Sequence, residues 1–389
     1  MRRAFLAALA LVIVSGSATA TEPAGPNKSH NVKLVKQFAY EGSTEIDVQG
    51  DFVYTGELDG VDNRGQDPEK GGMHVFDFSG KKAAETAFLR CPGNDNDVEV
   101  VKPGLVVMGY QRNFCALAGT GFMLVDVSNP KKPKILSTLA LPSGNAHTVA
   151  PYPGGDYVYV SEGGLRNGAG LEYIADISNP RKPKIVGSYK ASETGCHDTT
   201  FSFVEDRKLA FCSGVGETQI WDVADPLAPA VIGHIVNPAI QFHHSAVASS
   251  DGKLLAIDDE AFAAHECRSG RSPHGGVWVY DIGNPAVPIP LGSFSPPRGG
   301  DSVIGNYVEW VPSWCLAHYI AWMPGTYYLG VPWNTGGVSV LDFNDPRTPT
   351  EVAYYQPEKT AAYAVEWHEG RFLVSDMYQG LLVLEVGGL

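Results

Sequence analysis

Four histidines are the residues of this chain best suited to chemistry. His147, His197, His244 and His318 fall at or beside the same position in four consecutive units of an internal repeat. Neutral imidazoles are ligands for borderline metals such as Zn, Cu or Fe, whereas a Ca²⁺ site is built from oxygens. Imidazoles also titrate near neutrality and can act as general acids and bases without a metal. We expect a histidine-lined metal site, with metal-free acid–base work as the open alternative.

Polar residues beside these histidines are candidates for proton transfer. Two of them occupy the histidine position in other units, one follows His197, and one lies in a long loop. We predict as catalytic residues Asp97, Asp198, Glu260 and Tyr363. His243 places a fifth imidazole next to His244. In the alternative interpretation the histidines only form hydrogen bonds to neighbouring strands. That role predicts a histidine in nearly every unit, which the sequence does not have.

The repeat that sets these positions is clearest in the stretch VDVSNPKKPKI, which begins at Val125. Its relatives ADISNPRKPKI, WDVADPLAPAV, YDIGNPAVPIP and LDFNDPRTPTE begin at Ala175, Trp221, Tyr280 and Leu341. The period is about 50 residues, within the range of repeat architectures. Pro fixes φ and a preceding Asn or Asp caps a turn, so each Asn-Pro or Asp-Pro pair predicts a turn that serves the scaffold.

Each unit contains four β-rich runs, as in PKILSTLAL, HTVAPYP, DYVYVSE and LEYIADIS around residues 133–178. Four short strands per unit predict an all-β, seven-bladed propeller with four-stranded blades. The last unit, LLVLEV from Leu381, lacks a fourth strand. KLVKQFAY, from Lys33 to Tyr40, fits the outer-strand pattern, so we expect this N-terminal strand to pair with the C-terminal one and close the ring. Inner strands are expected near residues 44, 97, 147, 198, 244, 318 and 363.

The copies VDVSNPKKPKI and ADISNPRKPKI resemble the LVIVD repeat of secreted bacterial proteins. That resemblance implies propeller blades over residues 31–389 and an exported protein, and it implies no particular reaction. Residues 1–20 read as a signal peptide with two arginines, an apolar run and cleavage after Ala20, and residues 21–30 as a linker. We therefore expect a periplasmic or secreted protein made of one propeller domain.

Charge and hydropathy limit the partners. The net charge of −14 disfavours nucleic acid, and no apolar run after the signal peptide is long enough to span a bilayer. The expected partner is a small-molecule substrate or a surface ligand. The nucleophile elbow, His-Glu-x-x-His, Walker and Cys-x-x-Cys signatures are absent from the sequence.

Six cysteines in an oxidising compartment can pair in about 15 ways. The economical pairing joins near neighbours: Cys91 with Cys115, Cys196 with Cys212, and Cys267 with Cys315. Cys196 beside His197 could alternatively be a thiol nucleophile, but a disulfide is favoured in this compartment.

Long insertions are expected on the same face as the histidines. Residues 259–275 and 295–316 would bring toward the channel mouth the side chains of Glu260, His265, His274, Trp310 and Trp314, and a Cys267–Cys315 bridge would tie the two loops into a lid. Residues 58–72 form a polar, glycine-rich rim without an EF-hand spacing.

The leading hypothesis is a metal-dependent enzyme acting on a small molecule, either an oxidase or oxygenase, or a hydrolase that uses metal-bound water. The competing hypothesis is a non-catalytic cell-surface or periplasmic propeller that binds a ligand or a protein.

Overall fold

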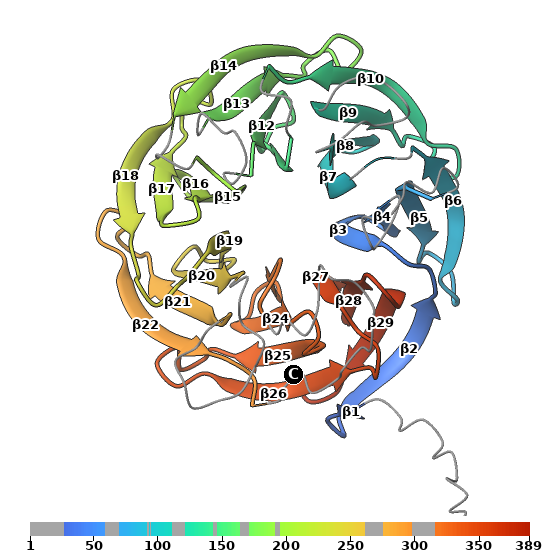
Figure 1. The fold of residues 1–389 in the computed structure, drawn as a ribbon, viewed down its shortest axis with the longest axis vertical. Helices are drawn as coiled ribbons and strands as arrows, with labels where there is room; N and C mark the ends of the chain where they lie inside the picture. Colours follow the sequence, from blue (N-terminus) through green and yellow to red (C-terminus); the bar gives the residue numbers. More distant parts are fainter. Residues whose placement is uncertain are drawn as a thin grey trace, which may run out of the picture.

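The computed structural model describes residues 27–58, 70–91, 93, 95–110, 121–142, 146–163, 171–190, 195–260, 275–297 and 316–389. Seven antiparallel sheets stand around a central channel, which confirms the seven-bladed propeller (Figure 1). The described part of the chain contains no helix that is long and apolar enough to cross a membrane.

The strands nearest the axis open each blade, and the three that follow lie progressively further out (Figure 1). The inner strands are β3 (Ser43–Gln49), β7 (Asp95–Lys102), β11 (Thr148–Pro151), β15 (Asp198–Val204), β19 (His243–Ala248), β23 (Ala321–Trp322) and β27 (Ala362–His368). The second strands are β4 (Phe52–Glu57), β8 (Leu105–Tyr110), β12 (Tyr157–Ser161), β16 (Arg207–Ser213), β20 (Leu254–Asp259), β24 (Tyr328–Pro332) and β28 (Arg371–Asp376).

The third strands carry the repeated Asp, or Glu385 in the last blade, at or near their ends. They are β5 (Gly72–Asp77), β9 (Gly121–Asp126), β13 (Leu171–Asp176), β17 (Thr218–Asp222), β21 (Val277–Asp281), β25 (Val338–Asp342) and β29 (Gly380–Val386). The outer strands are β6 (Ala84–Arg90), β10 (Lys134–Ala140), β14 (Lys184–Lys190), β18 (Ala230–Ile235), β22 (Ile289–Phe294), β26 (Thr350–Gln356) and β2 (Val32–Phe38).

The seventh blade takes its outer strand from the N-terminal side of the chain. β2 pairs antiparallel with β29 from Val32↔Val386 to Phe38↔Leu381, which is the pairing expected from the sequence. The two residues of β1 (Asn27–Lys28), in the segment expected to be a linker, pair with β26 of the sixth blade. Both pairings hold the N-terminal segment on the rim (Figure 1).

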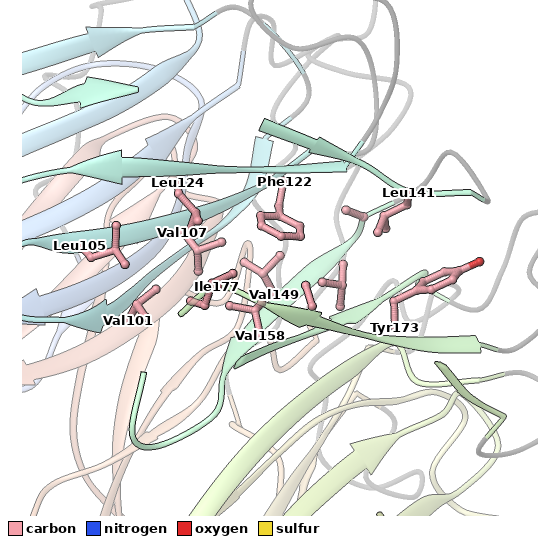
Figure 2. Close-up of a cluster of buried hydrophobic side chains, with 13 residues drawn as sticks. Val101, Leu105, Val107, Phe122, Leu124, Leu141, Val149, Val158, Tyr173 and Ile177 are labelled. Carbon is pink, nitrogen blue, oxygen red and sulfur yellow. The ribbon is translucent and has the colours of Figure 1, made fainter. Parts of the chain in front are cut away.

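Neighbouring blades bury their faces against each other. Leu105, Val107 and Phe122 of the second blade pack on Val149 and Val158 of the third (Figure 2). Strands buried on both faces read as continuous apolar runs, as in the fully buried LVVMGY of β8. The outer strand β14 alternates exposed and half-buried residues because one of its faces meets solvent.

The Asn-Pro and Asp-Pro turns that follow five of the third strands are capped as predicted. Asp126 Oδ1 accepts a hydrogen bond from Ser128 N at 3.0 Å, and Asn129 Oδ1 accepts one from Lys131 N at 3.2 Å. In the next blade, Asp176 Oδ1 accepts a hydrogen bond from Ser178 N at 2.9 Å. These side chains stabilise the scaffold, so the site has to be sought elsewhere.

A disulfide joins Cys196 and Cys212, which confirms that predicted pair. Cys91 is also disulfide-bonded, and its expected partner Cys115 lies outside the described residues. Cys267 and Cys315 lie outside them as well, as do His265, His274, Trp310, Trp314 and most of residues 58–72.

Candidate metal centre

The four histidines lie near the starts of the inner strands of four blades, and three of them share one backbone pattern. The amides of His147, His197 and His318 donate to the carbonyl of the last residue of the adjacent second strand, at 2.8, 2.6 and 3.1 Å. Consecutive rings then lie side by side. Their centroids are 4.1 Å apart for His147 and His197, 4.6 Å for His197 and His244, and 4.2 Å for His244 and His318.

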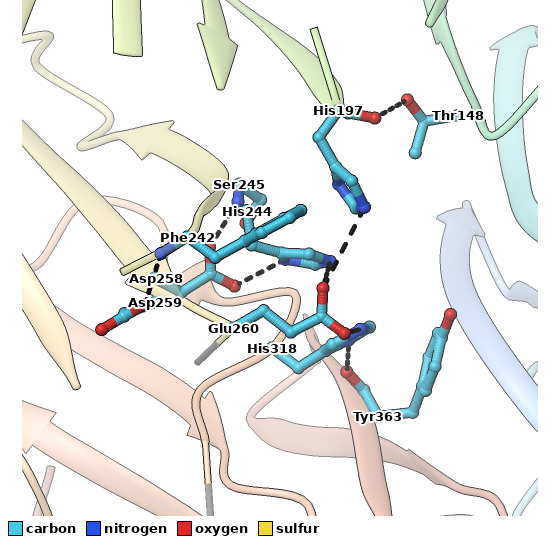
Figure 3. A network of polar contacts seen from close by, with 10 residues as sticks. All are labelled: Thr148, His197, Phe242, His244, Ser245, Asp258, Asp259, Glu260, His318 and Tyr363. Atoms are coloured by element: carbon cyan, nitrogen blue, oxygen red, sulfur yellow. Dashed lines mark hydrogen bonds and ion pairs between the residues drawn. The ribbon is translucent and has the colours of Figure 1, made fainter. Parts of the chain in front are cut away.

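Glu260 lies between three of these imidazoles, directly after β20 (Figure 3). Its Oε2 is 4.0 Å from His197 Nε2 and 3.6 Å from His244 Nε2, and its Oε1 is 3.8 Å from His318 Nε2. These separations exceed the roughly 3.2 Å limit of an N–H···O hydrogen bond. The carboxylate thus faces three ring nitrogens without bonding to any of them.

The opposite ring nitrogens of His244 and His318 are held by the protein (Figure 3). His318 Nδ1 lies 2.8 Å from the carbonyl oxygen of Tyr363. A carbonyl only accepts, so Nδ1 donates, and Nε2 of the neutral ring keeps its lone pair toward Glu260. His244 Nδ1 lies 3.2 Å from Asp258 Oδ2, whose partner oxygen accepts from the amide of Ser245. Such outer contacts orient metal-binding histidines.

Burial keeps the imidazoles neutral. It lowers the pKa of His147 and His244 to about 3, and together with the neighbouring imidazoles it holds the pKa of His197 and His318 well below the ordinary value. Burial, followed by the charges of Asp258 and Asp259, raises the pKa of Glu260 well above its usual range. A bound cation would favour both the neutral imidazoles and the ionised carboxylate.

The donor atoms suit a transition metal. The ligand atoms of His197, His244 and Glu260 all lie within 4.8 Å of one another. Two bonds of about 2.1 Å at a tetrahedral angle would separate their ligand atoms by about 3.4 Å. The observed 3.6–4.0 Å from Glu260 to the imidazoles is close to that spacing. Nitrogen and carboxylate donors together fit Zn, Cu or Fe.

The remaining predicted residues fall in three places. The Tyr363 ring packs 4.2 Å from that of His318, centroid to centroid. Asp198 lines a cavity of about 320 Å³ in the channel. Asp97 accepts a hydrogen bond from the amide of Val149 and groups with other carboxylates instead of the histidines. The fifth imidazole, His243, is fully buried, and its Nδ1 lies 2.8 Å from the Thr218 hydroxyl, so it serves the packing between blades.

Two residues of this site escaped the sequence analysis. Asp258 could have been found from strand periodicity, because it alternates with Glu260 on one side of β20 and its extension. Tyr319 carried no such signal. Its ring centroid lies 4.7 Å from that of His244 and 4.5 Å from that of His318, and its φ of 26° is unusual for a bulky residue.

Comparison with known protein families identifies the repeat in part of the chain. The LVIVD repeat family model matches residues 113–139 and 143–191, which confirms the resemblance noted in the sequence. No curated protein matches the chain. The chain therefore carries LVIVD repeats, and its activity has to be inferred from the site.

Proposed function

We propose that His197, His244, His318 and Glu260 bind Zn, Cu or Fe at the channel mouth, and that the protein is a metal-dependent enzyme acting on a small molecule. The observation that carries this proposal is the position of Glu260, 3.6–4.0 Å from three imidazole nitrogens. His147, whose ring packs against that of His197, is a further candidate ligand.

A metal bound there would polarise a substrate oxygen or lower the pKa of a bound water, and Cu or Fe would add electron transfer. The chain supplies the positioning: Asp258 and the Tyr363 carbonyl fix the rings of His244 and His318. Asp198, which lines the cavity, is our candidate for proton transfer, with Tyr363 as the other acid–base candidate. Asp97 is set apart because it groups with Glu45 and Glu99. The identity of the metal decides between oxidative and hydrolytic chemistry.

The Cys196–Cys212 disulfide supports an exported protein, since such bonds persist in oxidising compartments. We accordingly propose that the substrate is met in the periplasm or outside the cell. Cleavage after Ala20 can be checked by N-terminal sequencing of the mature protein.

Elemental analysis of the purified native protein tests the metal centre. We expect about one Zn, Cu or Fe per chain, and loss of at least nine-tenths of it in a His244→Ala, His318→Ala double variant. The matched control is His234→Ala, because His234 lies on an outer strand with its side chain 55% exposed and should leave the metal unchanged.

A native protein without stoichiometric transition metal would contradict the proposal. Stoichiometric metal without turnover of any substrate in a broad esterase, phosphatase and oxidase screen would instead favour the ligand-binding propeller.

A further inference from the structure

A second group of potential metal ligands lies on the first two blades. One carboxylate oxygen from each of Glu45, Asp97 and Glu99 falls within 4.8 Å of the others. Glu45 comes from β3, and Asp97 and Glu99 come from β7, which follows it around the channel. Because Asp97 and Glu99 are two residues apart on one strand, both point to the same side. The group contains no imidazole, so its chemistry differs from that of the histidines.

These carboxylates adjoin the channel cavity. Glu45 and Glu99 line the space of about 320 Å³, together with Asp198, Glu366 and Tyr319, and none of the described lining residues is basic. Asp47 also lines it; its two oxygens accept from the amides of Val48 and Val100, both at 2.6 Å, and its carboxyl shares a hydrogen bond with that of Glu99.

Tyr319, whose ring packs beside those of His244 and His318, also lines this cavity and supplies a second observation. Its side chain is only 6% exposed, and its hydroxyl has no hydrogen-bond partner among the described residues. The phenol lines the same cavity, and burial, followed by the charge of Glu45, raises its pKa well above the ordinary value. A buried hydroxyl is normally satisfied, by water or an ion if not by protein.

We propose that Glu45, Asp97 and Glu99 bind a hard divalent cation, Ca²⁺, at a site separate from the histidine centre. Ca²⁺ prefers six to eight oxygens at about 2.4 Å, so ligands on opposite sides lie about 4.8 Å apart. Three carboxylates supply three to six of these oxygens, and the cavity has room for water to supply the rest. Burial raises the pKa of Asp97 to about 7, and a bound cation would lower this pKa again because it favours the ionised carboxylate.

Calorimetric titration of the chelator-treated full-length protein with CaCl₂ tests this site. We expect one Ca²⁺ per chain in the unmodified protein and binding at least ten-fold weaker in Glu45→Gln and in Glu99→Gln. Two controls should bind Ca²⁺ as the unmodified protein does. Glu366→Gln removes a carboxylate from the same cavity, and Glu260→Gln removes the one in the histidine centre. Thermal melts without Ca²⁺ show whether each variant is folded.

Three results would overturn the proposal: no Ca²⁺ binding by the folded unmodified protein, equal weakening by Glu366→Gln, or loss of binding in Glu260→Gln. The second would mean that the cavity attracts cations without a defined site, and the third that Ca²⁺ occupies the histidine centre. Binding of putrescine in place of Ca²⁺ would also overturn it, since the cavity would then take an organic cation. Failure of the Zn, Cu or Fe measurement leaves this test unaffected.

Discussion

Asp258, Asp259 and Glu260 are consecutive residues with three different tasks. Asp258 and Glu260 lie on the side of the chain that faces the histidines. Asp259 lies on the other side and accepts hydrogen bonds from the amides of Gln241, Phe242 and Gly275, at 3.1, 2.9 and 3.2 Å. Asp376 caps the equivalent loop of the last blade. Asp259 therefore serves the repeat, and the residues on either side of it serve the site.

Asp258→Asn should weaken metal binding by about 10- to 100-fold, because the variant loses the carboxylate that orients His244. Competition with a chromogenic chelator measures the affinity for Zn²⁺ or Cu²⁺. Asp259→Asn is the matched control: it should lower the melting temperature without changing the affinity. An unchanged affinity in Asp258→Asn would show that this contact does not support a metal ligand.

The outer strands and the Asp-Pro or Asn-Pro turns form contacts between blades. Each outer strand has a register shift opposite its third strand, as between Ile220 and Trp221 in the fourth blade. Just beyond this bulge, the turn of the next blade comes close. A Cβ added to Gly233 would lie 2.1 Å from the carbonyl oxygen of Pro285, and one added to Gly292 would lie 2.3 Å from that of Pro346. The repeated turn therefore packs one blade against its neighbour.

Gly292→Ala should destabilise the protein by about 1–3 kcal/mol, since the new methyl would overlap a backbone carbonyl that cannot turn aside. The expected drop in melting temperature can be measured by calorimetry. Gly216→Ala is the control, because its added Cβ would meet nothing within 4 Å, and it should stay within about 0.5 kcal/mol of the parent. Equal melting temperatures for the two variants would argue against a tight contact between blades.

The propeller holds several buried or half-buried carboxylates, both at the channel and within the blades. Burial raises the pKa of Asp97 and Asp258 to about 7 and that of Glu172 and Glu366 to about 8. Between their unfolded and folded pKa values, the folded chain binds protons that the unfolded chain has released. The stability of the metal-free protein therefore falls as pH rises through this window. The histidines of the candidate metal centre, whose pKa values are lowered, act oppositely, and only below about pH 6.5, where the unfolded chain takes up protons.

Between pH 6.5 and 8 these carboxylates therefore lower the free energy of unfolding as the pH rises. Glu172 is fully buried on β13, and Glu172→Gln should remove up to about 1.4 kcal/mol per pH unit of the decline. Melting temperatures at pH 6.5, 7.25 and 8 in the presence of chelator give the slope. Glu358→Gln, at an exposed position, corrects for the change in net charge. A slope equal to that of the parent would mean that Glu172 is ionised in the folded state.

The repeat pattern alone is enough to predict the fold. Each blade is a local pattern of four strands and a capped turn, so repetition of VDVSNPKKPKI and its relatives was enough to predict the number of blades and the pairing of β2 with β29. The same alignment of repeated units predicted that His147, His244 and His318 lie at the start of inner strands. Neighbouring rings proved to be 4.1–4.6 Å apart because equivalent positions of adjacent blades meet at the axis.

Only the tertiary structure decided which side chains share an environment. Ring orientation and side-chain direction depend on contacts between blades, and no repeat fixes those. They turn His243 toward Thr218, place Glu260 between the imidazole nitrogens, and group Asp97 with Glu45 and Glu99. Closing the ring brings together residues that are far apart in the chain, so the division into a nitrogen-rich centre and an oxygen-only group could not be read from the spacing of residues along it.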